Sequence, residues 1–331
     1  MRLVSALLIV VAACWASHTY SEHHTGSNAF ETLYMHLVPA ALVHHGDDHG
    51  GGHDEAGHDG HAEHGDHHAA DPLLEVPMPA FMSTFDYRGS HATPEGELPK
   101  TVLFNLQLFQ VAAVLLVLVL FSGVPSYVRT GKGDKISSIL AGWAMWVRDE
   151  MVYPEMGKDL GRKFLPYFLC IFFFILFMNL MGLVPFSATA TASIFVTAAL
   201  ALTTLVAMVA CGMVAQGPLA FWKNLVPHVP AALWPLMFVV ELIGLLVKPF
   251  ALMVRLFANM SGGHMVVLSF MGLIFFFAGA WGSGGGWGST PIAVGFAVFI
   301  MIIEIFVAML QAYVFTTLSV IFVNASVHPE H

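Results

Sequence analysis

Residues 248–264 read KPFALMVRLFANMSGGH and place Arg255 in an otherwise apolar stretch. The apolar run around them extends over residues 231–280 without a polar loop, and a second run of thirty-five residues follows at 291–325. A helix of that length spans about 52 Å, whereas the hydrocarbon core of a bilayer is roughly 30 Å thick. The two runs therefore predict two unusually long membrane helices that are steeply tilted or lie partly in the membrane plane.

The composition of the whole chain also indicates a membrane protein. Of its 331 residues, 57% are hydrophobic and only 11% are charged, and the mean hydropathy is +0.73. A soluble domain carries about 25% charged residues. The sequence therefore predicts an all-α polytopic membrane protein with about five transmembrane helices. The predicted spans are 102–124, 164–186, 190–216, 231–280 and 291–325.

The last two segments are expected to form an antiparallel hairpin. Between them lies WGSGGGWGSTP at residues 281–291, which predicts a flexible turn on the outer side of the membrane. In such a hairpin, two residues at the same depth are equally distant from the turn. The midpoint of Arg255 and Gln311 is position 283, and that of His264 and Glu304 is position 284. Both polar pairs are therefore predicted to lie at matching depths.

Ionisable side chains inside these two segments suggest an ion path. Glu241, Lys248 and Arg255 are spaced by two helical turns and fall on one stripe. Charged groups inside spans almost always face a partner or a water-filled path. Arginine does not release its proton, so Arg255 would interrupt the path with a fixed positive charge. His264 and Glu304 would then exchange protons with the outer side, and Glu241 with the inner side.

Each polar residue also has a purely structural interpretation. Arg255 could belong to a buried ion pair, Lys248 could extend to the inner interface, and Glu241 could form an internal pair. Asn259, one helical turn after Arg255, and Gln311 could form ordinary interhelical hydrogen bonds, each worth about 0.6 kcal/mol in a membrane. The same interpretation is preferred for Asn179 and Thr197.

The first sixteen residues, MRLVSALLIVVAACWA, have the pattern of a signal peptide, with one basic residue, an apolar core and a small-residue end. Three fates stay open, namely cleavage after Ala16, lipidation of Cys14 as in bacterial lipoproteins, and retention as an uncleaved anchor. In each case residues 17–100 are expected to be an exported segment. Residues 101–331 are expected to form the membrane domain.

The distribution of basic residues predicts the orientation in the membrane. Seven of the thirteen Lys and Arg residues lie in the segment 125–163, which the positive-inside rule places in the cytoplasm. The N-terminus is then periplasmic, in agreement with the signal-peptide pattern, and the C-terminus is cytoplasmic. A signal peptide favours a bacterial inner membrane, and an organellar inner membrane is the alternative.

Residues 44–68 are rich in histidine, acidic residues and glycine. Such a segment cannot bury enough apolar surface to fold and is predicted to be disordered. It could be a solvated tether, a weak pH-dependent chelator of zinc or nickel, or a proton-buffering antenna. The candidate metal ligands are His44, His45, His49, His53, His58, His61, His64, His67 and His68.

Two other functional classes compete with an ion path. A zinc or nickel transporter would explain the histidine-rich segment, but it predicts His, Asp or Glu ligands three or four residues apart on one helix. The spans contain no such set. A purely structural anchor gives no reason for the matched depths of the polar pairs. The sequence lacks the phosphate-binding motif GxxxxGK[ST], so ATP chemistry would belong to other chains and this chain is not expected to be an enzyme by itself.

The motifs RLFANMSGGH at 255–264 and EIFVAMLQAYVF at 304–315 resemble subunit a of the F-type ATP synthase. The resemblance extends over about residues 100–325 and includes FMNLMGLVPFSATATASIFVTAALALTT at 177–204. The arginine motif followed by small residues, with a glutamine on the next long helix, is a specific signature. It implies that the two long C-terminal helices lie tilted along a ring of c subunits.

The resemblance also implies a role for each polar position. Arg255 would be the essential arginine that faces the c-ring and separates two half-channels, with Asn259 and Gln311 as its polar neighbours. His264 and Glu304 would line the outer half-channel, where some members carry the acid and the imidazole in the opposite order.

By the same resemblance, Glu241 matches a polar position of the inner half-channel. The implied partners are the c-ring, the b-type peripheral stalk subunits and the remainder of the ATP synthase, with one copy of this chain per complex in contact with lipid. No nucleic acid is implied, and no cofactor beyond zinc bound loosely by the histidine-rich segment. The expected coupling ion is H⁺, with Na⁺ as the alternative.

Overall fold

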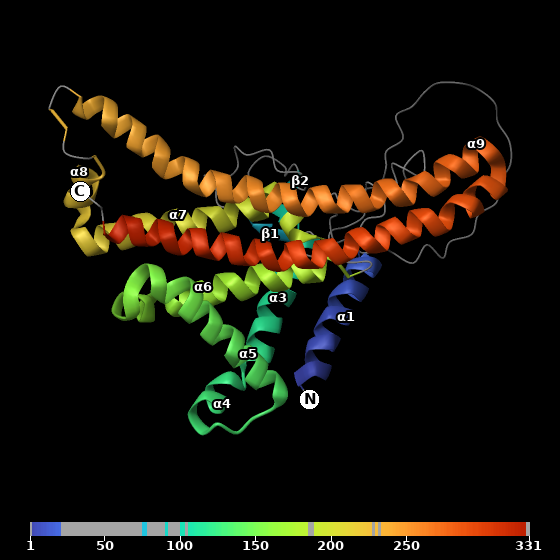
Figure 1. Cartoon of the computed structure of the whole chain (residues 1–331), viewed down its shortest axis with the longest axis horizontal. Coiled ribbons are helices and arrows are strands. Elements are labelled where there is room, and N and C mark those ends of the chain that lie inside the picture. Colours follow the sequence, from blue (N-terminus) through green and yellow to red (C-terminus); the bar gives the residue numbers. More distant parts are fainter. Residues whose placement is uncertain are drawn as a thin grey trace.

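The chain folds almost entirely into long helices (Figure 1). The computed structural model describes residues 2–20, 75–77, 90–91, 100–102, 105–184, 189–226, 229–230 and 233–328. Within these ranges, five helical runs are long and apolar enough to cross a membrane, and the predicted all-α polytopic class is confirmed. The five runs are Arg2–Tyr20, Asn105–Thr130, Lys135–Gly182, Ile194–Gln216 and Trp234–Val327.

The helices follow one another with short connections. The basic segment predicted to be cytoplasmic is itself largely helical, because α4, α5 and the start of α6 lie in it. A π-helical turn at Val147–Val152 joins α5 to α6, and a 3-10 turn at Ala190–Ala192 precedes α7. The helices are α1 (Arg2–Tyr20), α3 (Asn105–Phe121), α4 (Val124–Thr130), α5 (Lys135–Trp146), α6 (Tyr153–Gly182), α7 (Ile194–Gln216), α8 (Pro218–Asn224) and α9 (Trp234–Val327).

A small antiparallel sheet lies between α1 and α3 in the chain. Its strands are β1 (Glu75–Pro77), β2 (Ser90–His91) and β3 (Lys100–Val102), in the order β1-β3-β2. Glu75 pairs with Val102, and His91 pairs with Lys100. No pattern in the sequence predicted these strands. The histidine-rich residues 44–68, predicted to be disordered, lie outside the described residues.

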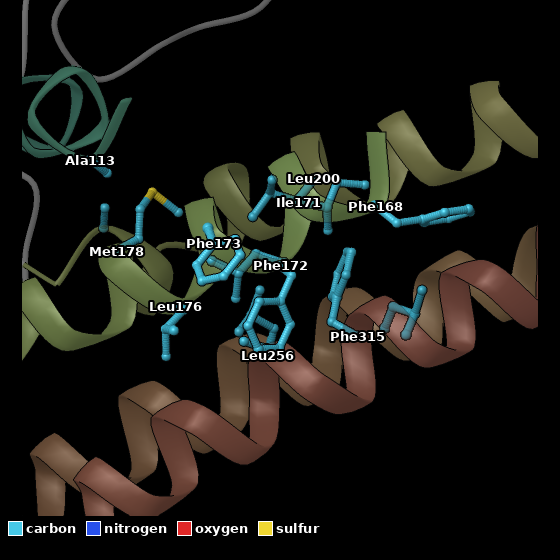
Figure 2. Close-up of a cluster of buried hydrophobic side chains, with 14 of the residues drawn as sticks. Ala113, Phe168, Ile171, Phe172, Phe173, Leu176, Met178, Leu200, Leu256 and Phe315 are labelled. Carbon is cyan, nitrogen blue, oxygen red and sulfur yellow. The ribbon is translucent and has the colours of Figure 1, made fainter. Parts of the chain in front are cut away.

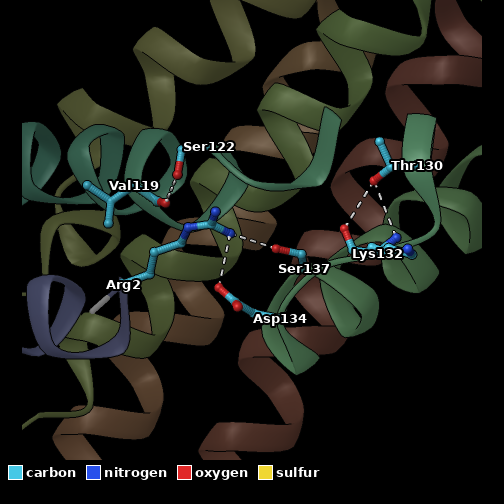
Figure 3. Close-up of polar contacts among 7 residues, drawn as sticks. All are labelled: Arg2, Val119, Ser122, Thr130, Lys132, Asp134 and Ser137. Atoms are coloured by element: carbon cyan, nitrogen blue, oxygen red, sulfur yellow. Dashed lines mark hydrogen bonds and ion pairs between the residues drawn. The ribbon is translucent and has the colours of Figure 1, made fainter. Parts of the chain in front are cut away.

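Helix α1 packs along α3 through small side chains. Ala6, Ala13 and Ser17 are its buried residues, and they allow the two helix backbones to approach closely. The Arg2 guanidinium donates a 2.6 Å hydrogen bond to the Ser137 hydroxyl and lies 3.7 Å from a carboxylate oxygen of Asp134 (Figure 3). The predicted signal peptide thus lies in a helix that packs against the membrane domain, and its cleavage or lipidation stays a prediction.

Helices α6, α7 and α9 form the core of the membrane domain (Figure 2). Aromatic and aliphatic side chains of α6 point at α9, where Leu256 and Phe315 are fully buried. Such packing is mainly van der Waals contact, since lipid tails are as apolar as the side chains. Helix α7 ends at Gln216 as predicted, because Gly217 has a φ of 94° and Pro218 cannot continue the helical hydrogen bonds.

Helix α9 is two helical arms that fold back on one another. The backbone leaves the helical region at Trp281 and Gly282, and the φ of 70° at Gly282 favours glycine. On either side of this break the two arms run side by side (Figure 1). The rings of Phe270 on the first arm and Phe296 on the second are stacked, with their centroids 5.1 Å apart. The break falls within one helical turn of the predicted midpoints at 283 and 284. Tilt relative to a membrane stays a prediction.

The predicted flexible turn over residues 281–291 is wrong in extent. Only Trp281 and Gly282 leave the helix, and residues 283–291 are already part of the second arm. Remaining helical lets the backbone N–H and C=O groups of residues 283–291 bond to one another within the second arm. The hydroxyls of Ser289 and Thr290 both donate hydrogen bonds to the carbonyl oxygen of Gly286, in the helical turn that precedes Pro291.

Truncation of Phe315 to alanine is expected to destabilise the domain by about 3 kcal/mol, because its ring is 0% exposed and a cavity would remain. The matched control is Phe195→Ala on α7, whose ring is 63% exposed and whose loss should cost less than about 0.5 kcal/mol. Thermal unfolding of the detergent-purified chain, followed by circular dichroism, measures both. Equal effects of the two substitutions would show that the α6–α7–α9 contact is not the core.

Candidate functional site

A direct hydrogen bond between an asparagine and a glutamine joins the two arms of α9. Asn259 Nδ2 on the first arm donates to Gln311 Oε1 on the second at 2.8 Å. Gln311 is 3% exposed, and its Nε2 has no hydrogen-bond partner within the described part of the chain. The pair is an interhelical hydrogen bond that leaves one amide donor unused.

Glu304 is a buried acid on the second arm. Its side chain is 6% exposed, and its Oε1 has no hydrogen-bond partner among the residues that the structure describes. The carboxyl group lies against Gly263 of the first arm, where an added Cβ would meet Oε1 and approach Cδ to 2.8 Å. Gly263 has no side chain, and this leaves the space that the Glu304 carboxyl occupies against the first arm.

Substitution of Gly263 by alanine is expected to push the Glu304 carboxyl out of its place. Neighbouring Gly262 has no atom within 4 Å of an added Cβ, so Gly262→Ala is the matched control. If the carboxyl takes part in the proton transfer that the sequence resemblance implies, Gly263→Ala should lower that transfer about tenfold or more. ATP-driven proton uptake into membrane vesicles measures it. Equal activity of the two variants would mean that the position of the carboxyl is unimportant.

His264 does not bond to Glu304, although the two were predicted to lie at matching depths. Its Nε2 lies 2.8 Å from the hydroxyl oxygen of Thr189, which follows α6 and precedes the 3-10 turn. The same hydroxyl donates to the carbonyl oxygen of Gly182 at the end of α6, at 3.2 Å. The sequence pattern did not identify Thr189, whose only signal was a polar residue between the predicted spans 164–186 and 190–216.

Asn179 of α6 contacts the second arm of α9 between Glu304 and Gln311. Its Nδ2 donates to the carbonyl oxygen of Ala308 at 3.3 Å, and the side chain is 0% exposed. Ala308 lies one turn from both Glu304 and Gln311, on the same helical face. The interhelical hydrogen bond preferred for Asn179 is therefore present. Its Oδ1 has no partner within the described ranges.

Arg255 lies on the outward face of the first arm. It is exposed, while Leu252 and Leu256 beside it are buried, and within the described residues it forms no ion pair. The alternative of a buried ion pair therefore finds no support there, and no hydrogen bond joins Arg255 to Gln311. Lys248, on the same predicted stripe, is exposed and has its Nζ 5.8 Å from the ring centroid of Phe322.

Two further predictions concern residues at the edge of this site or outside it. Glu241 lies in the second turn of α9 and is half-buried. The nine candidate metal ligands between His44 and His68 lie outside the described residues. In the ranges that the structure does describe, no three His, Cys, Asp or Glu residues are placed to hold a metal ion.

Comparison with known proteins identifies the family. The family model described as "ATP synthase A chain" matches residues 107–324, which include every polar residue of the site. The chain belongs to this family. Membership and the apolar helices together establish that it is a membrane protein of the ATP synthase subunit a type.

Individual relatives agree with this assignment. An ATP synthase subunit a of Myxococcus xanthus is 37% identical over 78% of this chain and 90% of its own length. A subunit a of Anaeromyxobacter dehalogenans is 43% identical over 70% of this chain, and one of Chloroherpeton thalassium is 41% identical over 67%. The match spans 59% and 65%, respectively, of the length of these two relatives.

Proposed function

We propose that this chain is the proton-translocating stator subunit of an F-type ATP synthase and supplies two offset half-channels to a ring of c subunits. The observation that carries the proposal is a row of polar groups along the α9 hairpin. From His264 and the buried Glu304, the row continues through Gln311 and Asn259 to the exposed Arg255. Family membership supports the same assignment.

In this proposal the outer half-channel uses groups that can take up and release protons. Glu304 is buried with an unpartnered carboxyl oxygen, so it can accept a proton without first breaking a hydrogen bond in the described part of the chain. Gln311 and Asn259 do not titrate, but their side-chain amides can form hydrogen bonds with water or a hydronium ion on the path. Protons would thus reach the middle of the membrane from the outer side only.

Arg255 would separate the outer route from the inner one. Arginine side chains carry no acceptor and do not act as proton relays in proteins. On the outward face of α9, Arg255 can meet a carboxylate of the c-ring and favour the ionised form of that carboxylate. A ring carboxylate that approaches Arg255 would release its proton on one side and accept another proton on the other side. Rotation of the ring would then carry protons past the arginine.

The inner half-channel is proposed to pass Glu241, which lies near the start of α9 on the opposite side of Arg255 from Glu304. A membrane potential supplies about 2.3 kcal/mol per charge per 100 mV. Several protons are therefore needed for each ATP molecule. The ATP chemistry itself is proposed to belong to partner subunits.

The proposed setting follows from the family and from the charge distribution. The partners would be the c-ring, the b-type peripheral stalk and the other subunits of the complex, with one copy of this chain in each. With the basic segment 125–163 in the cytoplasm, the C-terminus is proposed to be cytoplasmic in a bacterial inner membrane. The periplasmic location predicted for the N-terminus is proposed only for the exported segment after α1, because Arg2 contacts Ser137 and Asp134 of the basic segment and so lies on the cytoplasmic side. The proposed coupling ion is H⁺.

ATP-driven acidification of inverted membrane vesicles tests the proposal. Vesicles that contain the complete complex should take up protons when ATP is added, and substitutions at Arg255 and Glu304 should remove this uptake while the complex still assembles. Normal uptake by assembled complexes with either substitution would remove that residue from the proton path. Normal uptake with both would overturn the proposal.

A further inference from the structure

The hydrogen bond between Thr189 and His264 supports an inference that rests on the proposed function and deepens it. We infer that Thr189 is a positioning residue that holds His264 in the tautomer with its proton on Nε2. The other ring nitrogen, Nδ1, is then the atom that exchanges protons in the outer half-channel.

The inference follows from the hydrogen atoms that are available. A threonine hydroxyl has one hydrogen to donate and two lone pairs that accept. The Thr189 hydroxyl donates its hydrogen to the carbonyl oxygen of Gly182, at 3.2 Å. A carbonyl oxygen can only accept, so this contact and the 2.8 Å contact with His264 Nε2 are both hydrogen bonds only when Nε2–H donates to the hydroxyl oxygen. A neutral imidazole with the hydrogen on Nε2 has an unprotonated Nδ1.

The surroundings hold Thr189 in this arrangement. Its side chain is 8% exposed, and an added Cβ on Gly182 would lie 2.8 Å from its methyl carbon Cγ2 and 2.9 Å from its hydroxyl oxygen. The backbone of Thr189 is also engaged, because its carbonyl oxygen accepts from the amide of Ala192 at 3.0 Å. The hydroxyl therefore keeps its direction towards the histidine.

The tautomer decides how His264 can work with its acidic neighbour on the other arm. Glu304 lies against Gly263, directly before His264 in the chain, and its Oε1 has no partner in the described ranges. With Nε2 occupied by Thr189, Nδ1 is the position at which the imidazole can take up a proton and pass it on. A proton bound at Nδ1 leaves from the same atom, so each transfer is balanced and needs no other reactant.

Two substitutions separate the hydroxyl of Thr189 from its methyl group. Thr189→Val keeps the shape and the methyl contact with Gly182 but removes the hydroxyl, whereas Thr189→Ser keeps the hydroxyl and removes the methyl. ATP-driven proton uptake by the complete complex should fall about tenfold in the valine variant, the effect of one hydrogen bond of typical strength, and should stay within about twofold of wild type in the serine variant. A role in packing alone predicts the reverse order and would overturn the inference.

Nitrogen-15 NMR of the complete complex labelled in histidine tests the tautomer directly, and the His264→Gln variant identifies the resonances of His264. Wild type and Thr189→Ser should show a protonated Nε2 and an unprotonated Nδ1, and Thr189→Val should lose this pattern. A protonated Nδ1 in neutral wild-type His264 would overturn the inference, even where a variant fails to assemble. This result would leave the proposed function intact, since that function depends on Arg255 and Glu304 in the uptake experiment.

Discussion

Inverted vesicles whose complex carries Arg255→Ala are expected to lose ATP-driven proton uptake, with a fall of at least about 100-fold. The reason is electrostatic. At 4 Å and an effective dielectric constant of 20, a guanidinium and a carboxylate attract each other by about 4 kcal/mol. Without that attraction, no positive charge displaces the proton of the ring carboxylate. Protons then either cross between the two half-channels without driving rotation or stay bound to the ring carboxylate.

The control for this experiment is another cation on the same arm. Lys248 is also exposed, and its ammonium group lies over the ring of Phe322, so Lys248→Ala removes a positive charge without touching the proposed gate. Uptake by this variant should stay within about twofold of wild type, as expected for a surface substitution. Assembly is checked by the amount of c-ring recovered with the complex. An assembled Arg255→Ala complex that pumps normally would show that the arginine is structural.

Glu304→Gln is expected to reduce proton uptake by about 100-fold. Glutamine matches glutamate in size and fills the same space against Gly263, but it cannot bind and release a proton near neutral pH. General acid–base groups typically contribute about 10²–10⁴-fold to a rate, which sets the scale of the loss. Because no described residue bonds to Glu304 Oε1, the substitution should leave folding nearly unchanged.

Glu155→Gln serves as the matched control, since the Glu155 side chain is exposed and lies far from residue 304 along the chain. Its proton uptake should equal that of wild type. The thermal midpoint of each purified complex shows whether the substitutions changed stability. If Glu304→Gln retains full uptake at an unchanged midpoint, the buried acid has no part in proton transfer, and the outer half-channel must use other groups.

Much of the polar site could be predicted from one sequence because depth in a membrane helix is proportional to position in the chain. With a rise of 1.5 Å per residue, equal distances from a turn mean equal depths. The Asn259–Gln311 bond and the contact of Gly263 with Glu304 agree with this simple rule to about one turn.

The same rule says nothing about contacts that come from outside the hairpin. Thr189 reaches His264 from the connection between α6 and α7, and Asn179 reaches Ala308 from α6. Those contacts depend on how three helices pack sideways, and apolar side chains alone allow many such packings. Sequence spacing therefore predicted His264 and Glu304 at matching depths, whereas in the folded chain His264 forms its hydrogen bond with Thr189.

The sequence by itself determined the membrane class, the two long C-terminal segments, the centre of their hairpin and the set of polar residues inside them. These features follow from apolar length and from the cost of placing polar groups in hydrocarbon, which are properties of the chain. Tertiary structure alone decided that the turn is confined to Trp281 and Gly282, that Glu304 lies against Gly263, and that Arg255 remains on the outward face. The physical reason is that lateral contacts between helices depend on side-chain packing in three dimensions, which spacing along one chain does not specify.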